Sequence, residues 1–324
     1  MSAAPLVGIA KLAAASPLLE AKRLVHYFSL PTHRYIGRVS GRRMPFDWTV
    51  NPYRGCEFGC KYCYARYTHE FMELRNPLEF EQQIYAKEFQ PERFQAELRR
   101  IPRRESICIG TATDPYQPAE RRYGITHRML EVLAKERGRT LSLTTKSDLV
   151  ARDADLLARV GEHNNLHVFV TVTTTDARLA RLLEPYAPRP NLRFAAMQAL
   201  AGAGVRVGVL ACPVMPMLND TRVSLESVAA EARAAGARCL YGNVLFLKPC
   251  AQKVFFPFLD EYDPVLARKY REKFGGEHAF LEGSYPEMIR RRVEEVRKKF
   301  GLTDRPGRYL PDIPEAGEQL RLWI

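Results

Sequence analysis

Three cysteines stand close together in the stretch NPYRGCEFGCKYCYARYTH. Cys56, Cys60 and Cys63 have the spacing CxxxCxxC, so three thiolates can converge from one short loop. Thiolate sulfur is the ligand that iron–sulfur clusters require. Gly55 and Gly59 lack the β-carbon that would keep the backbone away from a cluster. No fourth cysteine or histidine follows at a short, regular interval, so a cluster held here keeps one metal position open.

The spacing, with an aromatic residue (Tyr62) directly before the last cysteine, resembles the signature of radical S-adenosylmethionine (SAM) enzymes. Further motifs resemble the spore photoproduct lyase-like branch of that superfamily. In chain order they are NPYRGC, YCYAR followed by His69, TDPYQPAE, TTKS and PVMPMLND. The resemblance implies a [4Fe-4S] cluster on the three cysteines, with SAM bound to the open iron. It also implies reductive cleavage of SAM to a 5'-deoxyadenosyl radical that abstracts hydrogen.

Judged on the cysteine triplet alone, a zinc site remains open. His69 or Cys108 would then be the fourth ligand, because clusters of Cys and His commonly bind zinc. The protein would be a zinc-stabilised nucleic-acid-binding module without catalysis. The motifs beyond the cysteine triplet favour the iron–sulfur interpretation.

The resemblance also implies which residues contact SAM. Thr113 corresponds to a small hydroxyl residue that faces the SAM methionine, and Lys146 to a basic residue suited to a carboxylate or ribose oxygen. Thr171 stands where relatives carry a serine in the same role. The full set of predicted cofactor-binding residues is Tyr62, Thr113, Asp114, Lys146, Ser147 and Thr171.

A hydrogen donor is harder to assign. Spore photoproduct lyases carry a donor cysteine close before the aspartate of the second-strand motif, and here that position is Thr111. The nearest thiol is Cys108, and strand alternation predicts that Cys108 and Thr111 face opposite sides. Cys212 lies at the end of a predicted strand, and Tyr116 could stack a base or relay a hydrogen atom. The catalytic candidates are therefore Cys108, Cys212 and Tyr116, and the substrate need not be spore photoproduct.

Six runs rich in β-branched or aliphatic residues predict strands. They are residues 48–51, 106–110, 140–144, 166–172, 205–211 and 239–247. Amphipathic segments between them predict helices, with Thr126, Asp153 and Asp176 as N-caps. Repeated βα units predict an α/β fold with a parallel sheet, and the resemblance implies a partial TIM-type (β/α)6 barrel. The motifs then fall at the carboxyl ends of the strands, where such barrels place their chemistry.

Residues 1–44 predict a poorly patterned lead-in that ends in the basic group RYIGRVSGRRM. Its arginines form either a solvated face or a phosphate-contacting lip beside the cluster. Residues 45–250 predict the radical SAM core. Within it residues 78–89 alternate partly and could add a strand between the first and second βα units.

Residues 251–324 predict a helical extension and tail. A loop is expected over residues 248–257, followed by basic helices over residues 264–274 and 286–300. The last helix either packs on the barrel with its arginines in water or contacts a DNA backbone. The tail EQLRLWI resembles the short peptide by which bacterial DNA-processing proteins dock on the sliding clamp; alternatively, it folds back on the barrel.

Composition and charge limit the partners and the cellular compartment that we expect for this protein. The chain has 324 residues, a formal net charge of +12 and seven cysteines. An excess of positive charge favours polyanionic partners, nucleic acid first. No run of eighteen apolar residues occurs, and an odd number of cysteines with three clustered favours a reducing compartment, so we expect a cytoplasmic protein without a membrane span. We expect a lyase-like DNA-repair enzyme with flavodoxin or ferredoxin as reductant; the alternative substrate is a peptide or small molecule.

Overall fold

The computed structural model describes residues 6–22, 24–39, 44–275 and 279–304. Its larger sheet has the strand order β11-β10-β9-β8-β7-β4-β3. Six of these strands are parallel and β3 pairs antiparallel at one edge. The strands are β3 (Ile36–Arg38), β4 (Trp48–Val50), β7 (Ser106–Ile109), β8 (Thr140–Thr145), β9 (Asn165–Thr171), β10 (Val207–Val214) and β11 (Cys239–Val244). All six predicted strands are therefore confirmed, and so is the parallel α/β fold.

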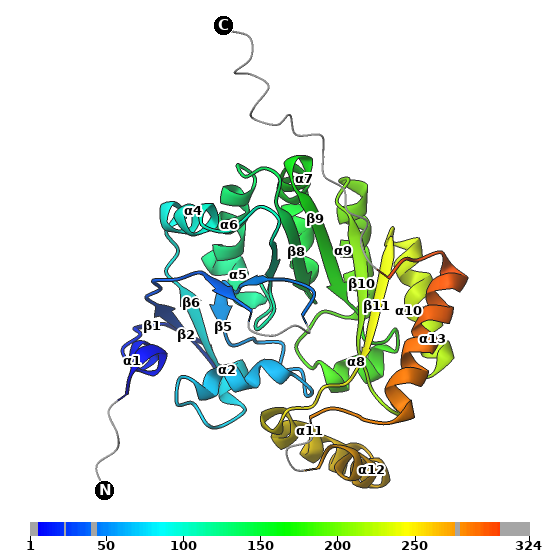
Figure 1. Cartoon of the computed structure of the whole chain (residues 1–324). Coiled ribbons are helices and arrows are strands. Elements are labelled where there is room, and N and C mark those ends of the chain that lie inside the picture. The colour runs from blue at the N-terminus through cyan, green and yellow to red at the C-terminus, as the bar shows by residue number, and fades with distance from the viewer. Residues whose placement is uncertain (1–5, 23, 40–43, 276–278, 305–324) are drawn as a thin grey trace, which may run out of the picture.

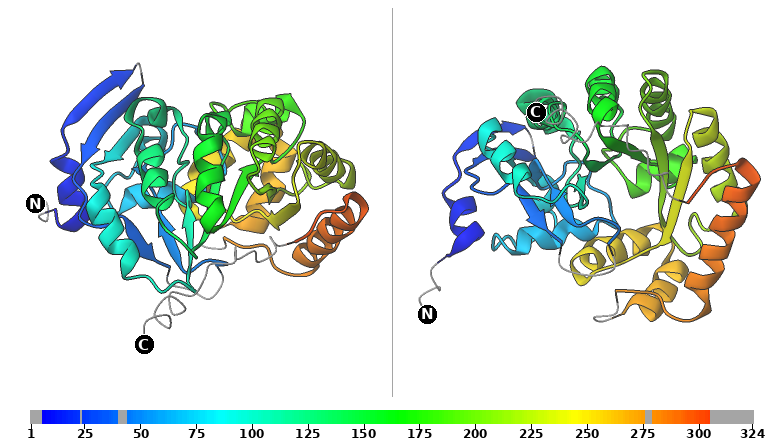
Figure 2. Two further views of the ribbon diagram at one scale, coloured as in Figure 1. Left: turned by 90° about the horizontal axis from the view of Figure 1, so that it is seen from above. Right: turned by 45° about the horizontal axis from the view of Figure 1, so that its top comes forward.

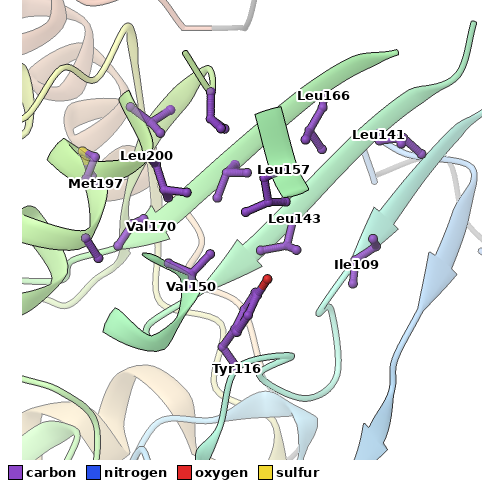
Figure 3. Packing of buried hydrophobic residues seen from close by; sticks show 14 of the residues in the cluster. Ile109, Tyr116, Leu141, Leu143, Val150, Leu157, Leu166, Val170, Met197 and Leu200 are labelled. Atoms are coloured by element: carbon purple, nitrogen blue, oxygen red, sulfur yellow. The ribbon is translucent and has the colours of Figure 1, made fainter. Parts of the chain in front are cut away.

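Helices follow the parallel strands and cover the outer face of the curved sheet (Figures 1 and 2). They are α5 (Pro118–Tyr123), α6 (Ile125–Leu133), α7 (Ala154–His163), α8 (Ala177–Leu183), α9 (Pro190–Gly202) and α10 (Arg222–Ala234), with the 3-10 helix η2 (Asp148–Asp153) before α7. The main hydrophobic core lies between this face and the helices (Figure 3). Helix α9 was not predicted, because its small and apolar residues give it almost no amphipathic pattern. The Asp176 side chain caps α8 as expected, whereas the Asp153 side chain caps no helix.

The prediction of a poorly patterned lead-in was wrong. A second sheet has the strand order β1-β2-β6-β5. Its strands are β1 (Leu18–Lys22), β2 (Val25–Leu30), β5 (Tyr53–Arg54) and β6 (Gln83–Lys87), and the short helices near it are α1 (Gly8–Ala14), η1 (Tyr64–Arg66), α2 (Tyr67–Glu70), α3 (Glu79–Gln82) and α4 (Pro91–Arg99). These strands are short, and β2 and β5 pair with the distant β6, although β1 and β2 form a local hairpin. The pairing with β6 cannot be read from local pattern. The extra strand expected within residues 78–89 is β6, which lies in this sheet and not in the barrel.

The loop expected over residues 248–257 is instead the start of helix α11 (Pro249–Tyr262). Pro249 occupies the first turn, where its missing N–H costs nothing, and Pro257 is tolerated inside the helix. The predicted boundary at residue 250 therefore falls inside a helix. The remaining helices are α12 (Pro264–Phe274) and α13 (Ser284–Phe300).

Helix α13 packs on β11 and α10 through Ile289, Val293 and Val296. Several of its basic side chains are held by carboxylates, including the pairs Arg291–Glu295 and Lys298–Glu294. This arrangement favours the expectation of a helix packed on the barrel. The clamp-like tail lies outside the described residues.

Arg38 pairs with Trp48 across β3 and β4, at the start of β4 and away from the cysteine loop. That arginine is therefore not part of a lip beside the cysteines; Arg42 and Arg43 lie outside the described residues. In the described part of the chain, no helix has both the length and the apolar character needed to cross a membrane.

Candidate active site

The cysteine loop leaves β5 and enters η1 at the carboxyl end of the first parallel strand. Cys56 and Cys60 are buried and Cys63 is half-buried. Gly55 has a φ of 81°, and a Cβ there would lie 2.7 Å from the carbonyl oxygen of Gln83 and 2.8 Å from that of Phe80. Only glycine fits, because the loop passes directly against the backbone of α3 and of the first residue of β6.

Backbone contacts hold this loop on both sides. The Cys56 N–H donates to the Phe80 carbonyl at 2.9 Å, and the Lys61 N–H donates to the Leu183 carbonyl at 2.9 Å. Arg66 Nη2 donates to the Cys60 carbonyl at 3.0 Å, while Nη1 of the same buried guanidinium pairs with Glu81. The arginine of the YCYAR motif therefore positions a cysteine; sequence analysis did not assign it a role.

Gln117, fully buried in the TDPYQPAE motif, was also missed. Its amide oxygen accepts from the Glu57 N–H at 3.0 Å, and its amide nitrogen donates to the Gly55 carbonyl at 3.1 Å. Thr113 Oγ1 donates to the same carbonyl at 2.6 Å and accepts from Gln117 Nε2 at 2.9 Å. The loop after β7 thus grips the backbone on both sides of Cys56.

Asp114 joins the ends of two neighbouring strands. It accepts from the Thr145 hydroxyl at 2.6 Å and from the Lys146 N–H at 2.7 Å. Ser147 caps η2 by accepting from the Leu149 N–H at 3.3 Å. Burial raises the pKa of Asp114 despite these donors. Asp114 and Ser147 therefore fix the backbone on both sides of Lys146.

Tyr62 anchors a buried ionic network that sequence analysis did not find. Its hydroxyl donates to Glu184, which also forms an ion pair with Arg193 at 2.5 Å. Arg193 Nη1 in turn donates to the Thr171 carbonyl at 3.0 Å. Burial alone would raise the pKa of Glu184, but Arg193 and Lys146 hold it below its usual value. These residues are far apart in sequence, so no local sequence motif indicates that they are in contact.

Lys146 lies close to the cysteines. Its Nζ is 5.8 Å from the centre of the Tyr62 ring. Burial would lower the pKa of Lys146, but Cys60 and Glu184 hold it above its usual value. Burial raises the pKa of Cys60 to about 12, so a cluster that binds here must displace protons from the thiols. A cation beside the cysteines favours their thiolate forms and suits a carboxylate ligand.

Tyr116 does not belong to this site. It is fully buried among Leu143 and Val150 in the main core (Figure 3), and its hydroxyl donates to Asp153 at 3.0 Å. This place in the main core argues against the catalytic role that the sequence predicts for Tyr116.

Cys108 and Thr111 lie on the same side of the sheet, which corrects the alternation argument. Cys108 is the register partner of Thr49, and the Thr49 hydroxyl shares a hydrogen bond with the Thr111 hydroxyl. The physical reason is Gly110, whose φ of 89° breaks the strand alternation before Thr111. Cys212 is half-buried at the end of β10, where its Sγ donates to the Tyr241 carbonyl at 3.6 Å.

The donor set suits an iron–sulfur cluster. Three thiols leave one backbone loop, with Gly55 allowing close approach. Among the described residues, no three His, Cys, Asp or Glu side chains already surround a single-ion position. The fit of an iron–sulfur cluster to this site therefore rests on the chemistry of the three thiols and on the course of the loop that carries them. His69, the other proposed zinc ligand, has Nε2 3.0 Å from the Gln83 carbonyl oxygen and packs against Phe80.

The model of the radical SAM superfamily matches residues 50–227. An uncharacterized protein of Mycobacterium tuberculosis strain H37Rv is 36% identical over 274 residues, which cover 84% of this chain and 79% of that protein. An uncharacterized protein of Methanocaldococcus jannaschii is 26% identical over 261 residues, which cover 79% of this chain and 84% of that protein.

Among solved structures, spore photoproduct lyase complexed with a dinucleoside spore photoproduct matches with a TM-score of 0.63 at 14% identity, covering 85% of this chain and 80% of that one. A mutant of that lyase has a TM-score of 0.65. This likeness establishes a shared fold. The family match decides for iron–sulfur chemistry over the zinc module, and the chain is an enzyme of the radical SAM superfamily whose cofactors are a [4Fe-4S] cluster and SAM.

Proposed function

We propose that this enzyme abstracts a hydrogen atom from DNA and that Cys56, Cys60 and Cys63 hold its cluster. The observation that carries the ligand assignment is the buried loop, which Gln117 fixes on both sides of Cys56 and Arg66 fixes at the Cys60 carbonyl. When bound, the cluster and SAM supply the one-electron cleavage that yields a 5'-deoxyadenosyl radical. The chain itself supplies orientation and keeps water from the site.

The residues around Lys146 suit the binding of SAM. The Lys146 ammonium group would pair with the carboxylate of the methionine part, beside the ring of Tyr62. Asp114 and Ser147 would position that lysine through its backbone. Thr113 already donates its hydroxyl proton to the Gly55 carbonyl, so towards SAM its oxygen can only accept.

Thr171 lies next to the main-core residues Val170 and Val172, and strand alternation directs its side chain to the inner face of the barrel. We infer that its hydroxyl faces the nucleoside part of SAM. Cys108 and Cys212 are the candidate hydrogen donors on that face. Burial raises the pKa of Cys108 to about 11, so it is a protonated thiol at neutral pH.

Two observations support DNA as the substrate. The net charge of +12 favours a polyanion, and the similarly folded spore photoproduct lyase is solved with a dinucleoside spore photoproduct. The activity would then be lyase-like repair of a DNA lesion, and a base in duplex DNA would have to leave the stack to reach the cysteine loop. All seven cysteines are free, which supports a reducing, cytoplasmic setting with flavodoxin or ferredoxin as electron donor.

The test compares wild type, Cys60→Ala and the control Cys239→Ala after anaerobic reconstitution. Cys239 is a buried thiol at the start of β11, away from the strand ends that carry the site. With dithionite and SAM, wild type and Cys239→Ala should form 5'-deoxyadenosine and Cys60→Ala should not. Ultraviolet-irradiated DNA should increase product relative to undamaged DNA. Product formed without any response to DNA would overturn the substrate assignment and leave the radical chemistry intact.

A further inference from the structure

Tyr64 links the two flanks of the barrel opening. Its hydroxyl donates to the Thr111 carbonyl after β7 at 2.5 Å. Its ring centre lies 6.2 Å from that of Phe246, which follows β11 at the other edge of the parallel strands. The cysteine loop therefore crosses the opening, and Figure 1 shows α2 and α11 close together on that side of the sheet.

Aromatic faces continue outward from this contact. Phe246 and Phe280 stack with ring centres 4.4 Å apart and an interplanar angle of 26°. Phe280 is 52% exposed, although burial of its ring would be favourable. Exposed stacked aromatic rings beside a functional opening are typical of surfaces that bind the bases of single strands.

Cations flank the same rings. Lys248 Nζ lies 3.6 Å from the centre of the Tyr67 ring and 5.8 Å from that of Phe246. Across the β5–β6 pairing, Arg54 is opposite Tyr85, and Lys87 follows two residues later on the same face. Burial lowers the pKa of Arg54, and the Tyr67 phenol acts against that shift. Tyr67 is therefore close to Arg54 as well as to Lys248 and connects Lys248 with this second pair of cations.

Among the described residues, no carboxylate forms an ion pair with these cations. In the described part of the chain, neither Arg54, Lys87 nor Lys248 forms a salt bridge, and Arg54 Nε is buried without a hydrogen-bond partner. Glu97 is the nearby carboxylate, but it accepts hydrogen bonds from the backbone N–H groups of Tyr35 and Ile36. Partly buried cations without counter-charges are costly, and phosphates would compensate them.

We propose that this surface binds one strand of DNA, with a displaced base stacked on Phe246 and Phe280 and phosphates on Lys248, Arg54 and Lys87. The proposal rests on the proposed function, because it gives the DNA substrate its path to the cysteine loop. It also predicts a preference for single strands over duplexes, since bases paired inside a helix cannot offer their faces to the rings.

The experiment measures fluorescence anisotropy of a labelled single-stranded oligodeoxynucleotide and of its duplex with the reconstituted enzyme and SAM. Wild type should bind the single strand more tightly. Phe280→Ala should weaken that binding about tenfold, as loss of one stacked base implies. Lys248→Met and Arg54→Met should each lower the slope of log affinity against log salt by about 0.7. Matched controls are Tyr262→Ala, an exposed ring on α11, and Lys135→Met, an exposed lysine after α6.

Far-UV circular dichroism and iron content of each variant show that it folds and carries its cluster. One outcome is that wild type binds DNA and that Phe280→Ala and Lys248→Met bind it as tightly as the controls Tyr262→Ala and Lys135→Met do. In that case this surface is not the binding site, and DNA stays the substrate. If wild type binds neither DNA form while producing 5'-deoxyadenosine, both the surface and the DNA assignment fall.

Discussion

Arg66 Nη2 donates to the backbone carbonyl of Cys60 at 3.0 Å, so a buried guanidinium fixes the middle cysteine of the loop. The other terminal nitrogen pairs with Glu81, whose side chain is only 12% exposed. Replacing Arg66 by Met keeps much of the apolar stem of the side chain. It leaves the Cys60 carbonyl and the Glu81 carboxylate without the guanidinium donor. We expect the cluster-free protein to lose about 3 kcal/mol of unfolding free energy and the reconstituted protein to bind less iron.

Urea unfolding and iron analysis would check this prediction. The control is Arg75→Met, which removes the exposed Arg75–Glu73 pair and should leave both quantities unchanged. Full iron content in Arg66→Met would mean that the cysteine loop keeps its form without this contact.

Tyr116→Phe separates a core role from a catalytic one. The hydroxyl donates to Asp153, which keeps its contacts with Arg152 and His127 after the change. We expect a loss of about 1 kcal/mol of unfolding free energy and an unchanged yield of 5'-deoxyadenosine. A lower yield at normal stability and normal iron content would return Tyr116 to the active site.

The parallel strands could be predicted because each is a local run of apolar residues. The grip on the cysteine loop was only partly predictable: Gln117 stands inside a recognised motif, yet nothing in its letters shows that its amide spans Gly55 and Glu57. The contact between Tyr62 and Glu184 joins residues 122 positions apart, and such pairs depend on the finished fold. The error at Thr111 arose because one glycine with positive φ breaks a periodicity that holds for the rest of the strand.

His69 should make the protein sensitive to acid. Burial lowers the pKa of His69 to about 4, below its ordinary value of 6.5. Between these two pH values the unfolded chain takes up a proton that the folded chain does not, so stability falls as pH decreases. Relative to His69→Gln, wild type should lose about 3 kcal/mol between pH 6.5 and pH 4.

Urea unfolding of both cluster-free proteins at several pH values checks this prediction. Other acidic groups titrate in both chains, so only the difference between the two curves matters. A difference that stays constant with pH would mean that His69 takes up its proton over the same pH range in the folded and the unfolded chain, and it would contradict the lowered pKa.

Lys87 should show the same sign as His69 at higher pH and connects stability with DNA binding. Burial and the neighbouring Arg54 lower the pKa of Lys87 to about 7, from 10.5. Below pH 7 the folded state carries an uncompensated charge, so Lys87→Met should be more stable than wild type there. The full shift corresponds to about 5 kcal/mol, but the side chain is half-buried and water screens its charge, so we expect about 1–2 kcal/mol. As pH rises from 7 towards 10.5 the folded lysine loses its proton before the unfolded one, and the advantage of the variant fades.

Urea unfolding at about pH 6.5 and about pH 9.5 measures this change, with Lys135→Met as a control that should show no pH-dependent difference. The same Lys87→Met protein should bind single-stranded DNA less tightly, because it lacks one phosphate contact. Greater stability together with weaker DNA binding would mean that the fold tolerates an unfavourable cation for the sake of its ligand. Greater stability with unchanged DNA binding would remove Lys87 from the proposed surface and leave Lys248 and Arg54 as its cations.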